Sequence, residues 1–121
     1  MTSSMITCER GEVIVVNVPY TNGSGIKARP ALVVSTGDFH RTLPDVMICP
    51  ISSQPRFYDR PGPGDHPLRR WRQAKLRHRS TVRVSKILTV DKRLIKTILG
   101  RVAAEDLSAV ESRLREALKL D

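Results

Sequence analysis

Short runs of apolar, β-branched residues, separated by polar or glycine-rich connections, make up most of the chain. GEVIVVNVPY (11–20), PALVVS (30–35) and VMICPI (46–51) each predict a strand, because β-branched side chains favour extended backbone. Two later runs, STVRVSKILTV (80–90) and LIKTILGRV (94–102), predict two more strands. The first part of the chain therefore indicates a small, mainly β structure.

The pattern changes near the C-terminus, where apolar residues recur at the spacing of a helix. The steps are three, four and four residues, through Leu107, Val110, Leu114 and Leu118. This spacing predicts an amphipathic helix over about 104–119. Several short strands followed by one helix favour a sheet that curls into a small barrel of about five to seven strands, closed by the helix. We expect a single domain over residues 1–121.

Two unusual segments separate the third and fourth predicted strands. Residues 55–67 hold four prolines and two glycines, which predicts a long irregular loop, either an insertion or a functional loop over a site. Residues 68–79 contain six lysines and arginines around Trp71. Such a tryptophan either stacks on the bases of single-stranded RNA or packs against the domain, and we favour packing because large core residues are few.

The charge of the chain points to polyanionic partners. Lysine and arginine number 21 against 12 acidic residues, giving a net charge of +9. A domain this basic concentrates polyanions at its surface, so nucleic acid is the leading expectation and an acidic protein the second. The sequence contains neither a basic amphipathic helix nor a long apolar span, and its N-terminal stretch lacks the apolar core of a signal peptide. We therefore expect a cytoplasmic protein that does not bind membranes.

Cysteines and histidines do not suggest a metal site. Cys8 and Cys49 belong to no CxxC pair and no Cys/His cluster, so we predict neither a metal nor another cofactor. Cys49 stands in an apolar run and is expected to be a buried small hydrophobe. His40, His66 and His78 fall in segments interpreted as irregular, with no spacing that pairs them, and we expect them at the surface.

Three stretches carry a family likeness. The first is GEVIVVNVPYTNGSGIKARPALVVS (11–35), with a glycine loop and an Arg-Pro that opens the second strand. The second is VMICPISSQ (46–54), a strand that ends in a hydroxyl residue. The third is STVRVSKILTVDKRLIKTILGRV (80–102), followed by the helix. In this order they resemble the MazF/PemK family of toxin endoribonucleases, over most of the chain except 55–79.

The resemblance implies both a fold and an activity. It implies an SH3-like barrel, a homodimer, and a cognate acidic antitoxin that covers the active face. It also implies sequence-specific, metal-independent cleavage of single-stranded RNA, including mRNA, which inhibits translation and growth. The products would carry a 2′,3′-cyclic phosphate and a 5′-hydroxyl.

Two residues are expected to be catalytic. Arg29 matches the family's Arg-Pro arginine, and a guanidinium suits the extra negative charge of a phosphorane. Ser52 matches the hydroxyl position, where it would bond the scissile phosphate. Their simpler interpretations are a solvated arginine beside Pro30 and a strand-end serine bonded to its own backbone. Further residues expected to contact RNA are Gly23, Ser24, Lys27, Ser53, Gln54 and Arg83.

The chain departs from the family near Arg83. Some members carry an acid two residues after this arginine that can serve as general base, whereas this chain has Ser85. Because serine is a poor base at neutral pH, the resemblance does not identify the base. The simpler interpretation of Arg83 is a solvent-facing charge on a strand.

Two alternative functions remain open. The first is a toxin of the CcdB kind, which has the same fold but binds DNA gyrase. Such toxins resemble one another in a C-terminal peptide that contains tryptophan. This chain ends in Leu-Lys-Leu-Asp, which argues against that alternative. The second is a basic barrel that binds nucleic acid without cutting it.

Overall fold

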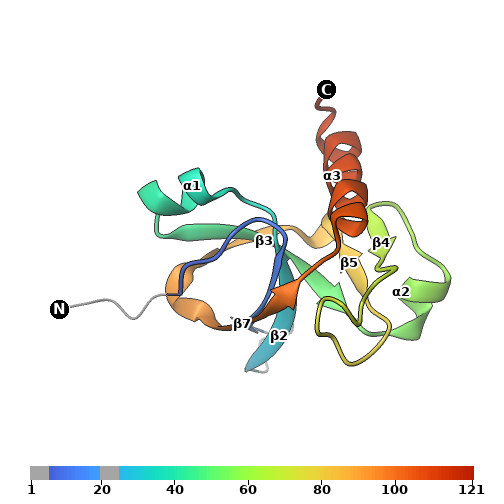
Figure 1. Ribbon diagram of the computed structural model, residues 1–121, viewed down its shortest axis with the longest axis horizontal. Helices are drawn as coiled ribbons and strands as arrows, with labels where there is room; N and C mark the ends of the chain where they lie inside the picture. Colours follow the sequence, from blue (N-terminus) through green and yellow to red (C-terminus); the bar gives the residue numbers. More distant parts are fainter. Residues whose placement is uncertain (1–5, 20–24) are drawn as a thin grey trace.

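A computed structural model describes residues 6–19 and 25–121, arranged as a curled antiparallel sheet with helices at its margins (Figure 1). The strands are β1 (Glu12–Pro19), β2 (Ile26–Val33), β3 (Asp45–Ser52), β4 (Asp65–Pro67), β5 (Thr81–Arg83), β6 (Leu88–Asp91) and β7 (Ile95–Arg101). The helices are α1 (Gly37–Thr42), α2 (Pro55–Asp59) and α3 (Ala104–Leu118), with 3₁₀ turns η1 (Val84–Lys86) and η2 (Lys92–Leu94). In this part of the chain no helix is long and apolar enough to cross a membrane.

The strands are hydrogen-bonded in the order β4-β5-β3-β2-β1-β7, with β6 paired to β3, and every pairing is antiparallel. The predicted mainly β fold with a curled sheet and a C-terminal helix is confirmed. Among the described residues no ladder joins β4 to β7, so the barrel stays open at this seam. Figure 1 shows α3 beside β4 and β5, whereas α1 lies at the opposite end of the sheet.

Strand β3 is the centre of the sheet because it pairs with three other strands. One edge bonds β2, and the other bonds β6 and then β5. The registers of these last two ladders differ by three residues, which is the length of η1. The continuous strand predicted over 80–90 is therefore wrong. The chain turns there because the Val84 N–H bonds the Gly64 carbonyl at 2.9 Å, which draws it towards β4.

The irregular loop predicted over 55–67 is also wrong in part. Helix α2 begins at Pro55, a position where proline loses no helical hydrogen bond. Strand β4 forms at the other end, where Asp65 pairs with Arg83 and Pro67 with Thr81 of β5. This pairing joins residues far apart in the sequence, so the composition of the loop does not reveal it.

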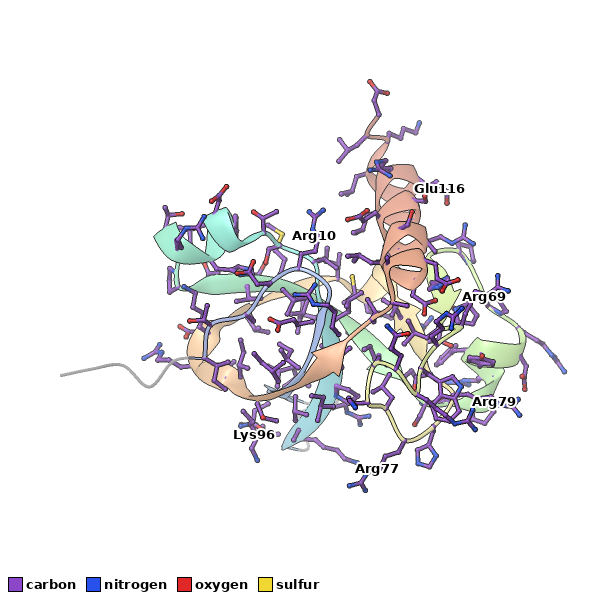
Figure 2. All side chains as sticks on the ribbon, in the orientation of Figure 1. Arg10, Arg69, Arg77, Arg79, Lys96 and Glu116 are labelled. Carbon is purple, nitrogen blue, oxygen red and sulfur yellow. The ribbon has the colours of Figure 1, made fainter. Side chains whose placement is uncertain are left out.

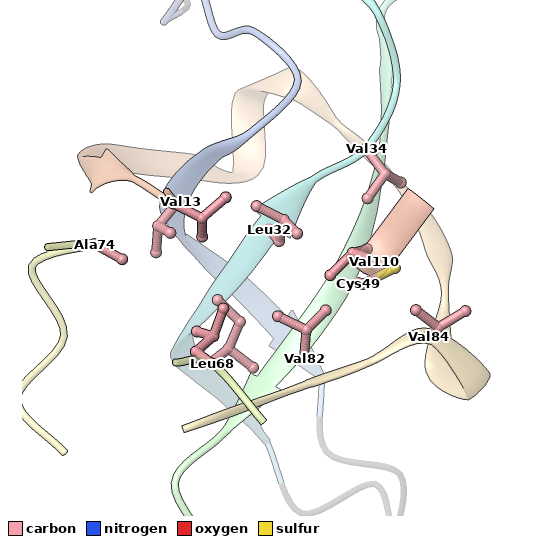
Figure 3. Packing of buried hydrophobic residues seen from close by; sticks show 11 residues of the cluster. Val13, Leu32, Val34, Cys49, Leu68, Ala74, Val82, Val84 and Val110 are labelled. Carbon is pink, nitrogen blue, oxygen red and sulfur yellow. The ribbon is translucent and has the colours of Figure 1, made fainter. Parts of the chain in front are cut away.

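Alternating residues fill two hydrophobic clusters on opposite faces of the sheet, as the period of a strand requires. Val13 belongs to the first cluster and Ile14, its neighbour, to the second. Figure 3 shows Leu32, Cys49 and Val82 of the first cluster around Val110 from α3. Cys49 is fully buried, which confirms its predicted role as a small hydrophobe.

Helix α3 covers the first cluster. The predicted helix is confirmed within one residue at its C-terminal end. Val110 is fully buried, and Leu107 and Leu114 pack partly buried beside it, whereas Leu118 is exposed. The helix thus buries about two turns of its apolar face against the sheet.

The first turn of α3 contributes a buried carboxylate. Asp106 accepts hydrogen bonds from His66 Nε2 at 2.8 Å, Arg69 N–H at 2.9 Å and Arg70 N–H at 3.0 Å. Burial raises the pKa of Asp106, but the bonds from Arg69, His66 and Arg70 together outweigh it, so the pKa lies below its usual 3.8. A single side chain therefore ties α3 to β4 and to the start of the basic segment 68–79.

We expect Asp106→Asn to lower the free energy of unfolding by about 3 kcal/mol, because the amide cannot accept all three bonds. Glu105→Gln is the matched control. It removes an exposed ion pair with Arg70 and should cost less than about 1 kcal/mol. Urea unfolding at neutral pH measures both. The wild-type advantage over Asp106→Asn should shrink as the pH falls below 3.8, because the unfolded chain then takes up a proton at Asp106 before the folded protein does. Equal stabilities at neutral pH would contradict this role.

Candidate functional site

Strands β2 and β3 bring the two expected catalytic residues to one end of the sheet. The ladder pairs Ala31 with Pro50, and continuing this register by two residues along each strand sets Arg29 opposite Ser52. Because side chains alternate along a strand, both lie on the face of the second hydrophobic cluster, to which Ala31 belongs. Arg29 is exposed and Ser52 is half-buried. A polyanion at this end of the sheet can therefore reach a guanidinium and a hydroxyl together.

Ser52 has the backbone contact expected of a serine at a strand end. Its Oγ accepts the Gln54 N–H at 3.2 Å. This bond uses a lone pair of the hydroxyl and leaves its hydrogen able to donate to a phosphate oxygen. The structural and functional interpretations of Ser52 are therefore compatible. Ser53 and Gln54 are exposed immediately after it.

The other expected contacts on β2 extend the same face. Lys27 is exposed two residues before Arg29, opposite Val18 of β1. Both cations lie where the apolar side chains of this face end. Gly23 and Ser24 lie outside the described residues.

Arg83 has a different environment from Arg29. Its Nε donates to Asp65 at 2.9 Å, and its guanidinium lies 3.7 Å from the ring centre of Phe57. Asp65 is only 3% exposed and also accepts the Gly62 N–H at 2.9 Å. The interpretation of Arg83 as a solvent-facing charge is therefore wrong, because Arg83 joins β5 to β4 and α2. The carboxylate beside it comes from the opposite strand, and Ser85 is exposed in η1.

A pocket of about 620 Å³ opens next to Ser53, between α2 and the basic segment 68–79. We call it the Trp71 pocket. Arg72 lies 4.4 Å from the ring centre of Trp71, and Arg79 lies 5.9 Å from that of Tyr58. In Figure 2, Arg79 lies near α2 and Arg77 lies at the lower edge of the molecule, both away from Glu116 on α3. The lining residues are Ser53, Pro55, Tyr58, Asp59, Trp71, Arg72, Arg77, His78 and Arg79.

Residues 9–118 match the model of a protein family described as PemK-like, MazF-like toxins of type II toxin–antitoxin systems. The chain belongs to this family. The resemblance seen in the sequence is thus confirmed over nearly the whole chain, and the match also spans the segment 55–79 that the resemblance left out.

Solved structures share the fold of this toxin. A mycobacterial endoribonuclease in complex with its cognate antitoxin has a TM-score of 0.76 at 23% identity, covering 94% of this chain and 97% of that one. MazF in a MazE–MazF complex from Deinococcus radiodurans has a TM-score of 0.75 at 22% identity, covering 96% and 100%. The Mycobacterium tuberculosis toxin MazF-mt6 has a TM-score of 0.66 at 20% identity, covering 89% and 98%. No curated protein sequence matches the chain.

Two of the toxin's histidines are buried, so the expectation of three surface histidines is wrong. His40 Nδ1 donates to the Cys8 carbonyl at 2.9 Å, since a carbonyl can only accept, and its Nε2 bonds the Ser35 hydroxyl. His66 bonds Asp106. Cys8 and Asp106 lie far along the chain from the histidines that they bond, so no local sequence pattern predicts that these histidines are buried. His78 is exposed and lines the Trp71 pocket.

The cysteines of the toxin are poor nucleophiles. Burial, with lesser contributions from neighbouring carboxylates, raises the pKa of Cys8 to about 11, and burial raises the pKa of Cys49 to about 12. Both thiols therefore stay protonated at neutral pH. Among residues 6–19 and 25–121, no group of three or more histidine, cysteine and acidic side chains could hold a metal ion.

We expect Arg83→Ala to lower the free energy of unfolding by about 2 kcal/mol, because it leaves the buried Asp65 carboxylate without its cation. Arg29→Ala is the comparison, since Arg29 is an exposed arginine within β2 whose side chain supports little packing, and its loss should change stability by less than about 0.5 kcal/mol. Thermal and urea unfolding of the two variants measure the difference. Equal losses of stability would contradict the greater structural role of Arg83.

Proposed function

We propose that this toxin is a sequence-specific endoribonuclease that cuts single-stranded RNA in the cytoplasm without a metal ion, and so inhibits translation and growth. One observation supports the proposal: in a chain of this toxin family, the β2–β3 ladder pairs Ala31 with Pro50, and the same register continued by two residues would set Arg29 opposite Ser52. The net charge of +9 supports a polyanionic substrate. The two relatives described as endoribonuclease and MazF, both bound to antitoxins, support the same class.

The chemistry that fits these residues is an internal transfer at phosphorus. The ribose 2′-hydroxyl loses its proton, and its oxygen attacks the adjacent phosphorus atom. The bond from phosphorus to the 5′-oxygen breaks, and that oxygen takes up a proton. The products are a 2′,3′-cyclic phosphate and a 5′-hydroxyl, with no water or metal consumed. The 2′-oxygen must lie in line with the leaving oxygen, which an unpaired, flexible strand permits.

Arg29 and Ser52 act on the charge that develops in this step. As the phosphorane forms, negative charge grows on its non-bridging oxygens, and the Arg29 guanidinium neutralises it with paired N–H donors. The Ser52 hydroxyl donates to the same group and fixes its position. Lys27, Ser53, Gln54 and Arg83, with Gly23 and Ser24, hold the flanking nucleotides.

We expect Arg29→Ala to lower the rate of cleavage by about two to three powers of ten, the scale of losing one charge-stabilising donor. Ser52→Ala should lower it by about tenfold to a hundredfold, because a neutral donor is weaker. Arg115→Ala removes an equal charge from an exposed site on α3 and should leave the rate within about twofold. Cleavage of an unstructured RNA, assayed in excess EDTA with end-group analysis of the products, measures all three.

Three results would contradict this proposal in different ways. Wild-type rates in both active-site variants would show that the site lies elsewhere. Activity lost in EDTA and restored by magnesium would overturn the metal-independent mechanism. Binding without any cleavage would favour a non-catalytic barrel, and inhibition of gyrase without cleavage would favour a toxin of the CcdB kind.

The toxin acts as a homodimer held in check by a cognate acidic antitoxin. The relatives solved with their antitoxins support the antitoxin, and the charge of this chain suits an acidic segment that is disordered when free. The carboxylates of that segment would lie near Arg29 and the Arg69–Arg79 run, where RNA phosphates otherwise bind. Apolar anchors would supply most of the affinity, because exposed ion pairs contribute little.

We expect the antitoxin and RNA to compete for one surface. When the toxin–antitoxin complex is titrated with a non-cleavable RNA analogue, the fraction of toxin bound to antitoxin should fall as the fraction bound to RNA rises. Light scattering of the free toxin should give twice the chain mass of 13.6 kDa. Simultaneous binding of antitoxin and RNA with unchanged affinities would contradict the shared surface. The mass of a single chain at the working concentration would contradict the homodimer.

A further inference from the structure

We propose that the Trp71 pocket holds a nucleobase of the bound RNA, adjoining the cleaved phosphate, and that Asp59 reads the edge of that base. This inference rests on the proposed RNA-cleaving function and adds a subsite to it. The pocket encloses about 620 Å³, enough for a purine.

Flat groups suited to a base line this pocket. Trp71 and Tyr58 each carry a guanidinium over the ring, from Arg72 and Arg79 respectively. Bases stack on aromatic rings and on guanidinium planes alike. A base can therefore lie against the guanidinium planes of these pairs or against the exposed parts of their rings. Arg72 and Arg79 also place positive charge where the phosphates flanking that base would pass.

The pocket adjoins the proposed cleavage site at the end of β3. Ser52 faces the second hydrophobic cluster, whereas Ser53, the next residue, lines the Trp71 pocket. Trp71 packs against the first cluster, on the other face of the sheet. A bound strand would therefore pass around the end of β3, with its cleaved phosphate on one face and a neighbouring base on the other.

Hydrogen bonds hold the walls of the pocket in place before any ligand arrives. The Tyr58 hydroxyl donates to the Leu68 carbonyl at 3.1 Å, and the Leu76 N–H bonds the Trp71 carbonyl at 3.2 Å. The start of the segment is fixed by the bonds from Arg69 N–H and Arg70 N–H to Asp106. A pocket formed in advance saves the ordering cost that a loose loop would impose on binding.

Asp59 decides which part of a nucleotide the pocket fits. Its carboxylate repels a phosphate but accepts hydrogen bonds, so the lining favours a base edge that carries N–H groups. Guanine presents two adjacent N–H donors on its Watson–Crick edge, which match the two oxygens of a carboxylate. Uracil presents one. We therefore expect a preference for guanine over uracil in this pocket.

The fluorescence of Trp71 tests the proposal directly, because it is the sole tryptophan of the chain. The probes are short RNAs methylated at every 2′-oxygen, which cannot be cut, with one guanine in a uracil background or uracil alone. Fluorescence anisotropy of end-labelled probes gives the affinity independently of the tryptophan. We expect saturable quenching of Trp71 by the guanine probe, at the concentration at which anisotropy reports binding, and about tenfold weaker binding of the uracil probe.

Variants separate the two parts of the inference. Trp71→Ala should weaken binding of the guanine probe by about tenfold or more, the scale of one base–aromatic stack, whereas Trp71→Phe should retain most of the affinity. Asp59→Asn should reduce the preference for guanine without abolishing binding. Arg115→Ala, remote from the pocket, should change neither. If Trp71→Ala does not fold, the titration of the wild-type protein and of Asp59→Asn, at an exposed position, still tests the proposal.

The outcomes distinguish the pocket from the nuclease. Binding by anisotropy with unchanged Trp71 emission overturns the pocket, and cleavage of ordinary RNA by the same sample leaves the nuclease standing. Quenching with guanine preference but no cleavage supports the pocket and overturns the nuclease. Quenching by an acidic glutamate-rich peptide, but not by RNA, overturns the proposal and assigns the pocket to the antitoxin.

Discussion

A single buried carboxylate, Asp106, orders the half of the molecule that lies beyond β3. Its three hydrogen bonds reach His66 of β4 and the backbone of Arg69 and Arg70. This one side chain bonds the first turn of α3 to both the short strand β4 and the basic segment. The segment has little regular structure of its own, so Asp106 fixes its start, and the bonds of Leu68 and Leu76 hold the rest.

The two faces of the sheet have separate tasks. The face under α3 is closed by the helix and by residues of segment 68–79, including Leu68 and Ala74. The other face holds the second cluster and ends in exposed cations on β2. Both faces therefore bury apolar side chains, and the exposed cations of β2 lie beyond the second cluster, where a long polyanion can bind.

The sequence predicts what depends on local periodicity and misses what depends on remote partners. Short runs of apolar, β-branched residues predicted β1, β2 and β3, and the spacing of Leu107 and Val110 predicted α3. Strand β4 and the break at η1 were missed, because both arise from pairing between residues near 65 and residues near 83. The buried state of His66 was missed for the same reason, since its partner lies 40 positions away.

The candidate site shows the same limit. Arg29 and Ser52 were predicted from the family resemblance, because no spacing rule brings residues of two different strands into register. The Trp71 pocket was predicted only as a basic stretch with a tryptophan. Tyr58 and Asp59 come to it from a segment that composition described as a loop. Their arrival depends on α2, a short helix whose only clear local signal is the proline at its start.

The central place of β3 has a consequence for when activity first appears during synthesis. Strand β3 is made before two of its three partners, β5 and β6, which lie some thirty or more residues further along, and Asp106 follows them. When β3 first emerges during synthesis it therefore lacks the pairing of Ser52 with Thr81, because β5 is made later. The end of β3 that carries Ser52 is therefore completed only once β5, made later, has folded against it.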